Sequence, residues 1–146
     1  MPNQSSLAIL IELATREADN ATTRLGVATQ SREEAAQKLA LLEHYRENYA
    51  ADYQKSMANG LSIWKYHNFQ VFLENIERAI LSQKEIVRRA HERVMVEREA
   101  WQVVERKRLS YKVLDEQAAQ RKLYMENKQE QKLTDEHATR QHHHKF

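Results

Sequence analysis

Met57-Ala58-Asn59-Gly60-Leu61-Ser62 is the stretch that decides the fold, because it holds the only break in an otherwise helical pattern. Asn and Gly both tolerate a positive φ and often end helices. The flanking sequence is dominated by Ala, Leu, Glu, Gln, Lys and Arg, a composition typical of long helices and coiled coils. A short turn at this point favours a chain that folds back on itself over one straight rod. A straight, parallel dimer is the competing structure.

Before the turn, apolar residues repeat every three and four positions. With Ile11 as position a, the a column is Ile11, Ala18, Leu25, Arg32, Leu39, Arg46 and Tyr53, and the d column is Leu7, Ala14, Ala21, Ala28, Ala35, Leu42 and Tyr49. This seam predicts a first helix over about residues 6–56, and its many alanines suggest close approach of the partner helix. We expect Ser5 or Ser6 to cap the helix start. Gly26 is expected to weaken the helix locally without ending it, as a tolerated position and not as a hinge.

After a turn at about residues 57–62, a longer helix is predicted over about 63–138, with Ser62 as its cap and a flexible tail at 139–146. The first core positions are Phe69, Phe72 or Leu73, Ile76, Ala79 or Ile80, Gln83, Ile86 or Val87, Ala90 and Val94. Further core positions are Trp101, Val104, Tyr111, Leu114, Ala118 and Met125, and the apolar stripe thins after residue 118.

Folding back at Asn59-Gly60 would place residue 49 near 70, residue 42 near 77 and Leu7 near 112. The sequence therefore predicts one all-α domain over 1–146, an antiparallel two-helix coiled-coil hairpin with a longer second helix. Most of the chain beyond Tyr111 would then lack an intramolecular partner. Because a long helix needs something to pack on, the N-terminal residues and the overhang from Leu114 to Arg140 are a predicted partner site.

Composition excludes several classes of protein. Gly occurs 2 times, Pro once and Cys not at all in 146 residues, which argues against strand-and-turn folds, disulfides and thiolate metal sites. The formal net charge of +2 argues against a strong non-specific nucleic-acid binder. Arg88-Arg89 and Arg106-Lys107-Arg108 are accompanied by glutamates at helical spacing. No apolar run approaches the length of a membrane span, and a cytoplasmic protein is expected.

Nothing in the sequence points to catalysis. It has no Gly-rich phosphate loop, no nucleophile motif and no HExxH metal pair. Three adjacent histidines, His142 to His144, are interpreted as part of a solvated tail. We therefore expect no enzyme activity, no catalytic residues, no metal site and no cofactor.

Aromatic residues gather around the turn. Tyr45, Tyr49, Tyr53, Trp64, Tyr66, Phe69 and Phe72 all lie within this part of the sequence. Some must fill the seam, whereas Tyr45, Trp64 and Tyr66 fall off its simplest pattern. Exposed aromatics are enriched in binding hot spots, so part of this group is a candidate docking surface.

These residues also carry a resemblance. From about Leu7 to Arg140 the chain resembles the FliJ family of flagellar export proteins. The likeness rests on length, turn position and the stretches Leu25-Gly26, Leu42, Tyr45, Tyr49, Met57, Asn59-Gly60, Asn68, Gln70, Phe72, Glu77, Ala79-Ile80, Glu126-Asn127, Gln131-Lys132 and Asp135-Glu136.

The resemblance implies a soluble component of the flagellar type III export apparatus, similar to the γ stalk of rotary ATPases. Such proteins insert their terminal end into the ring of the export ATPase FliI, promote its assembly and hydrolysis, contact the export-gate protein FlhA and assist export chaperones. The chain would then meet the inner membrane only through these partners.

Candidate contact residues follow from the resemblance and from the hairpin register. Positions matched to the FlhA-facing surface are Leu42, Tyr45, Tyr49, Phe72, Ile76 and Ala79. Lys38 and Gln83 stand where that surface is expected to have Gln and His. Residues expected to meet the ATPase are Leu7, Leu10, Leu114, Ala118, Met125, Gln131, Lys132 and Asp135. Two alternatives stay open: the stalk of a virulence type III secretion ATPase, and a structural coiled-coil dimer without an ATPase partner.

Overall fold

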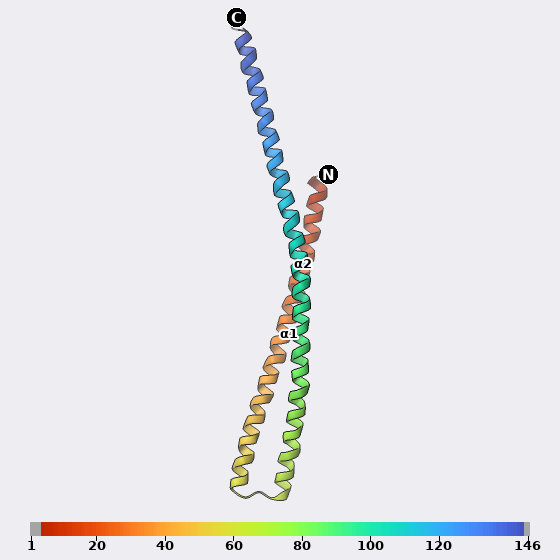
Figure 1. The fold of residues 1–146 in the computed structure, drawn as a ribbon, viewed down its shortest axis with the longest axis vertical. Helices are drawn as coiled ribbons and strands as arrows, with labels where there is room; N and C mark the ends of the chain where they lie inside the picture. The colour runs from red at the N-terminus through yellow and green to blue at the C-terminus, as the bar shows by residue number, and fades with distance from the viewer. Residues whose placement is uncertain (1–3, 145–146) are drawn as a thin grey trace. The chain divides into compact units, whose positions relative to one another are not determined.

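The computed structural model describes residues 4–144, in which two helices make up all the regular structure (Figure 1). Helix α1 (Gln4–Ala58) has 55 residues and helix α2 (Ile63–His144) has 82. The expected fold is confirmed as an all-α, antiparallel helical hairpin whose second helix is the longer. Helix α2 continues past the expected end at residue 138, and residues 145 and 146 of the expected tail lie outside the described part.

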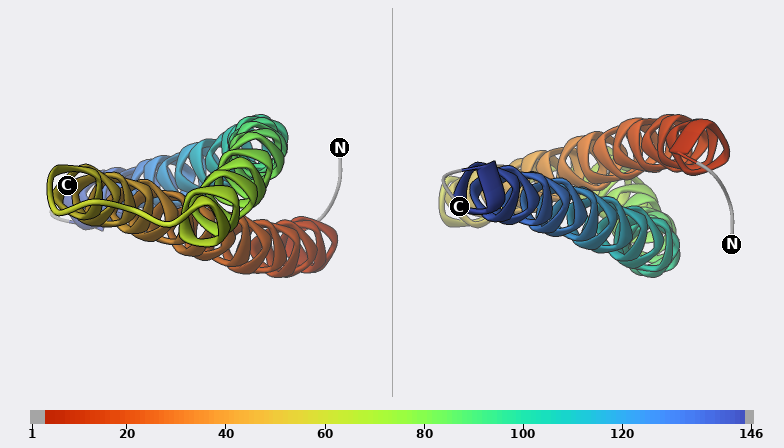
Figure 2. Two further views of the ribbon diagram at one scale, coloured as in Figure 1. Left: turned by 90° about the horizontal axis from the view of Figure 1, so that it is seen from below. Right: turned by 90° about the horizontal axis from the view of Figure 1, so that it is seen from above.

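The turn is closed by the residues that the sequence singles out. Gly60 has a φ of +84°, the left-handed conformation that glycine adopts without steric cost. Its N–H donates to the carbonyl of Met57 at 3.3 Å. The Ser62 hydroxyl accepts a hydrogen bond from the Lys65 N–H at 3.3 Å, so Ser62 caps α2 as expected. The left view of Figure 2 shows this loop crossing between the two helix ends.

The expected cap of the first helix is wrong. Helix α1 begins at Gln4, so Ser5 and Ser6 lie within its first turn and do not precede it. The sequence pattern gave no sign of this, because the apolar repeat starts only at Leu7. Gly26 lies inside α1 as expected, and a Cβ built on it would meet no atom within 4 Å.

The chain divides into two compact units, one of them Asp19–Gln102 with the turn at its end. We call it the turn unit. Its core packs small residues of α1 against larger residues of α2, as the heptad pattern predicts. The buried apolar residues of this unit are Ala21, Ala28, Ala35, Ile76, Ile80 and Val94. Small side chains on one helix permit close packing, and the larger ones opposite supply the apolar area.

Two polar side chains are buried in the turn unit, and each is satisfied. Gln83, which is 4% exposed, donates from Nε2 to the carbonyl of Ala35 at 3.0 Å. The Glu97 carboxylate meets Arg93 at 2.8 Å and Arg24 of α1 at 3.4 Å. Gln83 and Glu97 therefore link α2 to α1 through polar contacts, and not through apolar burial.

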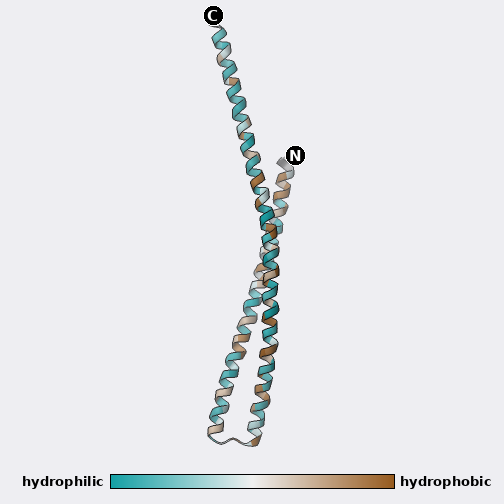
Figure 3. Cartoon of the chain, in the orientation of Figure 1, coloured by the Kyte–Doolittle hydropathy of each residue, from teal (hydrophilic) through white to brown (hydrophobic). Residues whose placement is uncertain are grey.

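The second unit combines residues up to Ala18 with Val103 and the rest of α2, and we call it the terminal unit. Leu7, Ala14 and Ala18 are its buried apolar residues, and Lys107 Nζ lies 3.8 Å from a Glu17 carboxylate oxygen. Ala118 is the last half-buried residue of α2, and every residue from 119 to 143 is exposed. Figure 3 shows that this last part of the helix is mostly hydrophilic.

Candidate partner-binding surfaces

The turn unit contains a stack of aromatic rings between its two helices. Helix α1 contributes Tyr45, Tyr49 and Tyr53 at one-turn intervals, and α2 contributes Tyr66, Phe69 and Phe72 at the opposing positions; we call these six residues the aromatic ladder. Ring centroids of Tyr49 and Phe72 are 4.3 Å apart and those of Tyr49 and Phe69 are 5.0 Å apart. These contacts match the predicted register, in which residue 49 lies near 70.

The ladder has both a packed and an exposed side. Tyr53 lies 5.3 Å from Phe69 and 6.1 Å from Tyr66, while Tyr45 lies 6.1 Å from Phe72. Tyr45 is nevertheless 54% exposed. Burial raises the pKa of the Tyr49 phenol and the nearby Tyr45 raises it further, so Tyr49 is neutral at physiological pH. The ladder therefore presents an aromatic surface that is partly accessible to a partner.

The six residues matched to the FlhA-facing surface are not equally accessible. Tyr45, Tyr49 and Phe72 contact one another in the ladder, Leu42 is half-buried and Ala79 is exposed. Ile76 is only 6% exposed, so it supports the surface from the core and offers little area of its own. Gln83, expected at the edge of this surface, is bonded inside the seam, whereas Lys38 is exposed.

The residues expected to meet an ATPase fall into two settings. Within the terminal unit, Leu7 is buried and Leu10 and Ala118 are half-buried, whereas Leu114 is 51% exposed. Met125, Gln131, Lys132 and Asp135 lie on the fully exposed stretch of α2. The exposed stretch also carries large apolar residues that the sequence analysis did not single out, namely Leu123, Tyr124 and Leu133.

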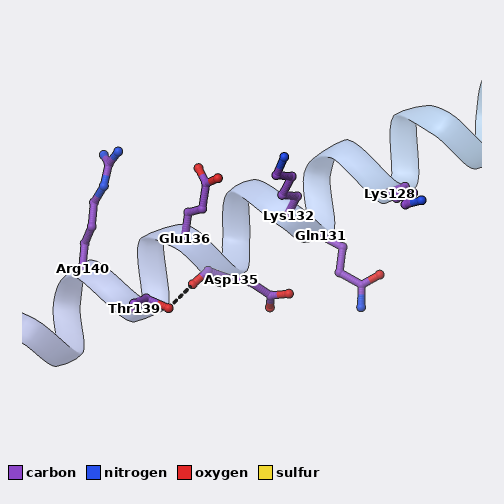
Figure 4. Close-up of a pocket in the computed structure, with 7 residues that line it drawn as sticks. All are labelled: Lys128, Gln131, Lys132, Asp135, Glu136, Thr139 and Arg140. Carbon is purple, nitrogen blue, oxygen red and sulfur yellow. Dashed lines mark hydrogen bonds between the residues drawn. The ribbon is translucent and has the colours of Figure 1, made fainter.

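Figure 4 shows how residues project from this last stretch of α2. Gln131, Lys132 and Asp135 extend from successive turns of the same helix, together with Lys128, Glu136, Thr139 and Arg140. One bond links two of these residues: the Thr139 hydroxyl donates to the main-chain carbonyl of Asp135 at 2.9 Å. The shallow hollow that these residues line lies along one helix. A surface of this kind suits contact with another protein better than enclosure of a small molecule.

The basic clusters of α2 are largely neutralised by nearby glutamates, most of them on the same helix. Arg88 bonds to Glu85 and Glu92, and the hydrogen bond from Arg88 is the main cause that lowers the pKa of Glu85 to about 2. Arg108 bonds to Glu105, and Lys107 faces Glu17. Cations that are already paired with carboxylates have little charge left to neutralise the phosphates of a nucleic acid. The pairing therefore argues against strong nucleic-acid binding by these clusters.

Residues 4–144 contain no group of three or more His, Cys, Asp or Glu side chains that could hold a metal ion. Neither helix, over that same range, has a stretch long and apolar enough to cross a bilayer.

The sequence is similar to known proteins over nearly its whole length. A family model described as "Flagellar FliJ protein" matches residues 3–145. The chain is 26% identical over 140 residues to the flagellar FliJ protein of Escherichia coli (strain K12), which covers 96% of this chain and 95% of that protein. It is similar to the flagellar FliJ protein of Salmonella typhi at the same identity and coverage.

Proposed function

Because the chain belongs to the FliJ family of flagellar proteins, we propose that it is a stalk-like activator and assembly factor of the export ATPase FliI, and that it links this ATPase to the export gate FlhA. Its role as a component of the flagellar export apparatus follows from the family. The partners, the contact residues and assistance to export chaperones are the proposed part.

The exposure of α2 from residue 119 to residue 143 is the observation that carries the ATPase contact. Most helical stability in proteins comes from tertiary packing, which this exposed stretch lacks, so packing against another protein would stabilise it. Leu123, Met125 and Leu133 are each about 60% exposed and supply apolar anchors among polar neighbours. A helix of this kind suits the inside of a ring, where protein surrounds it on every side.

The aromatic ladder supports the second contact. Tyr45 combines a large exposed area with a ring held against Phe72, so it loses little side-chain freedom on binding. Aromatic residues held in this way are typical anchors of protein interfaces. The ladder belongs to the turn unit and the exposed stretch to the terminal unit, so one chain carries two separate surfaces for two partners.

A truncation tests the ATPase contact. Ending the chain after Ala119 removes residues 120–143, all of them exposed, together with the last three residues, so the residues described as buried in both units remain. We expect stimulation of FliI hydrolysis to fall at least about tenfold, since several apolar anchors are lost together. A chain that ends after Arg140 is the matched control and should stimulate normally. If the shorter chain stimulates FliI as well as the full chain does, the stalk role is wrong.

A substitution tests the gate contact. Tyr45→Ser removes the most exposed ring of the ladder, and Leu41→Ser removes a still more exposed apolar side chain that the ladder does not include. We expect Tyr45→Ser to weaken binding to the cytoplasmic part of FlhA by about tenfold or more, and Leu41→Ser to leave it unchanged. Equal loss in both variants, measured by calorimetry, would argue against the ladder as the gate contact.

A further inference from the structure

The turn end of the hairpin carries the two most exposed large apolar side chains in the described part of the chain. Ile63 is 85% exposed and Trp64 is 79% exposed, and both lie in the first turn of α2. Met57, near the end of α1, is 52% exposed. We call these three residues, with Lys55 and Lys65, the tip surface. The aromatic ladder leaves Trp64 out, because its ring contacts end at Tyr66.

The charge around the tip surface is of one sign. Between Asp52 and Glu74 the sequence contains no acidic residue, although charged residues make up 30% of the whole chain. Lys55, Lys65 and His67 are all exposed in this interval. Elsewhere on the helices the cations are interspersed with glutamates, as for Arg88 with Glu85 and Glu92. The tip surface thus combines exposed apolar residues with a local excess of positive charge, although Asp52 stands three residues before Lys55 on α1.

We propose that the tip surface binds the headgroup region of an anionic lipid bilayer. Trp is enriched where membrane meets water, because its ring is apolar and its N–H is polar. Ile63 and Met57 would enter the boundary of the acyl chains, and Lys55 and Lys65 would meet lipid phosphates. Because the ends of both helices meet at the turn, they can reach a flat surface with the hairpin intact (Figure 2).

The positive charge of the tip surface favours an anionic bilayer over a second copy of the chain as its binding partner. Two tip surfaces would bring four lysines together without an acidic residue between Asp52 and Glu74 of either copy to offset them. An anionic bilayer offers phosphates to both lysines and an apolar layer to Ile63 and Trp64. This inference goes beyond the proposed function, in which only partner proteins connect the chain to the membrane.

The test uses the full chain and vesicles of known composition. We expect it to sediment with vesicles of phosphatidylethanolamine and phosphatidylglycerol, and weakly or not at all with vesicles of phosphatidylcholine. The double variant Ile63→Ser with Trp64→Ser should weaken binding at least about tenfold. Lys55→Gln and Lys65→Gln should each weaken it about fivefold. Leu81→Ser is the matched control, because Leu81 is 67% exposed on α2 outside the tip surface, and it should bind normally.

Tryptophan emission gives a second reading that does not depend on sedimentation. The chain has 2 tryptophans, and Trp101 donates to the Thr22 hydroxyl at 3.0 Å inside the turn unit. In a Trp101→Phe background the emission of Trp64 should shift to the blue on adding anionic vesicles and be quenched by brominated lipid. In Trp64→Phe, the emission of Trp101 should not change.

Three results would overturn the proposal. The first is an absence of sedimentation with anionic vesicles. The second is equal binding by the Ile63→Ser, Trp64→Ser variant. The third is a Trp64 shift that grows with protein concentration without lipid, because it would assign the tip surface to contact between copies of this chain. Since none of these experiments contains FliI or FlhA, their failure leaves the proposed function standing.

Discussion

Gln83 of α2 donates a hydrogen bond to the main-chain carbonyl of Ala35 in α1, and this bond crosses the buried seam at 3.0 Å. The small side chain of Ala35 lets the two helices approach closely enough for a side chain to reach the backbone of the other. The carbonyl of Ala35 also belongs to the hydrogen-bond ladder of its own helix. Without this bond the buried amide of Gln83 would lose its partner, whereas the carbonyl of Ala35 would keep its helical hydrogen bond.

Gln83→Met tests what this bond contributes. Methionine fills a similar volume and leaves no buried donor without a partner, so we expect the free energy of unfolding to change by less than about 1 kcal/mol. Gln83→Ala leaves a gap at the seam and should lower it by about 2 kcal/mol. Urea unfolding followed by circular dichroism measures both. A large loss of unfolding free energy in Gln83→Met would mean that the hydrogen bond, and not the filled volume, is the main contribution of Gln83 to stability.

The seam shows how far the sequence determines the fold. The heptad columns predicted that alanines 14, 18, 21, 28 and 35 would be buried, and they are, because a period of seven residues keeps one face turned toward the partner helix. Gly60 and Ser62 identified the turn, since a positive φ and a capping hydroxyl are local requirements that few residues meet.

Other features could not be read from the periodicity. Glu97 is buried although glutamate is usually a surface residue, because its neutralising partners come from both helices and only the folded chain brings Arg24 close. Ile63 was not singled out, since the pattern does not say which residues the helix ends leave uncovered. Ile76 lies in the core, and its residue type alone did not distinguish a core role from a contact role.

The buried carboxylate of Glu97 gives a second prediction. Its side chain is 8% exposed and is shared between Arg24 and Arg93. Arg24→Ala or Arg93→Ala alone should lower the free energy of unfolding by about 1 kcal/mol or less, because the other guanidinium remains. The double variant leaves a buried charge without a partner and should cost more than the sum of the two. A double-mutant cycle measured by urea unfolding checks this, and strictly additive losses would contradict it.

The two glycines provide a matched pair. Gly26 lies within α1 with open space around it, so Gly26→Ala should raise the free energy of unfolding by about 0.5 to 1 kcal/mol through helix propensity. Gly60 has a φ of +84°, so Gly60→Ala should lower it by about 1 kcal/mol although it too has open space. Thermal unfolding of both variants distinguishes them. Effects of the same sign would show that φ does not control the turn.

The pairing of Arg88 with Glu85 predicts a dependence on acid. Because the folded-state pKa of Glu85 is lowered to about 2, the stability from this pair is present above the ordinary carboxyl pKa and is lost as the pH falls toward 2. The difference in melting temperature between the natural chain and Arg88→Gln should therefore be constant near neutral pH and shrink below about pH 4.5. Salt should reduce it at every pH, because the pair is exposed. A difference that grows in acid would exclude this pairing.

The aromatic ladder predicts the opposite dependence, at high pH. Because burial and Tyr45 raise the pKa of Tyr49, folding favours its neutral form. That contribution is complete below the ordinary phenol pKa of about 10 and is lost as the pH rises through the folded-state value. Tyr49→Phe cannot ionise, so it should lose less stability than the natural chain above about pH 10. Tyr124→Phe, at a 65% exposed position outside the ladder, is the control and should follow the natural chain more closely. Urea unfolding at a series of alkaline pH values measures all three, and parallel losses would mean that Tyr49 ionises without cost inside the ladder.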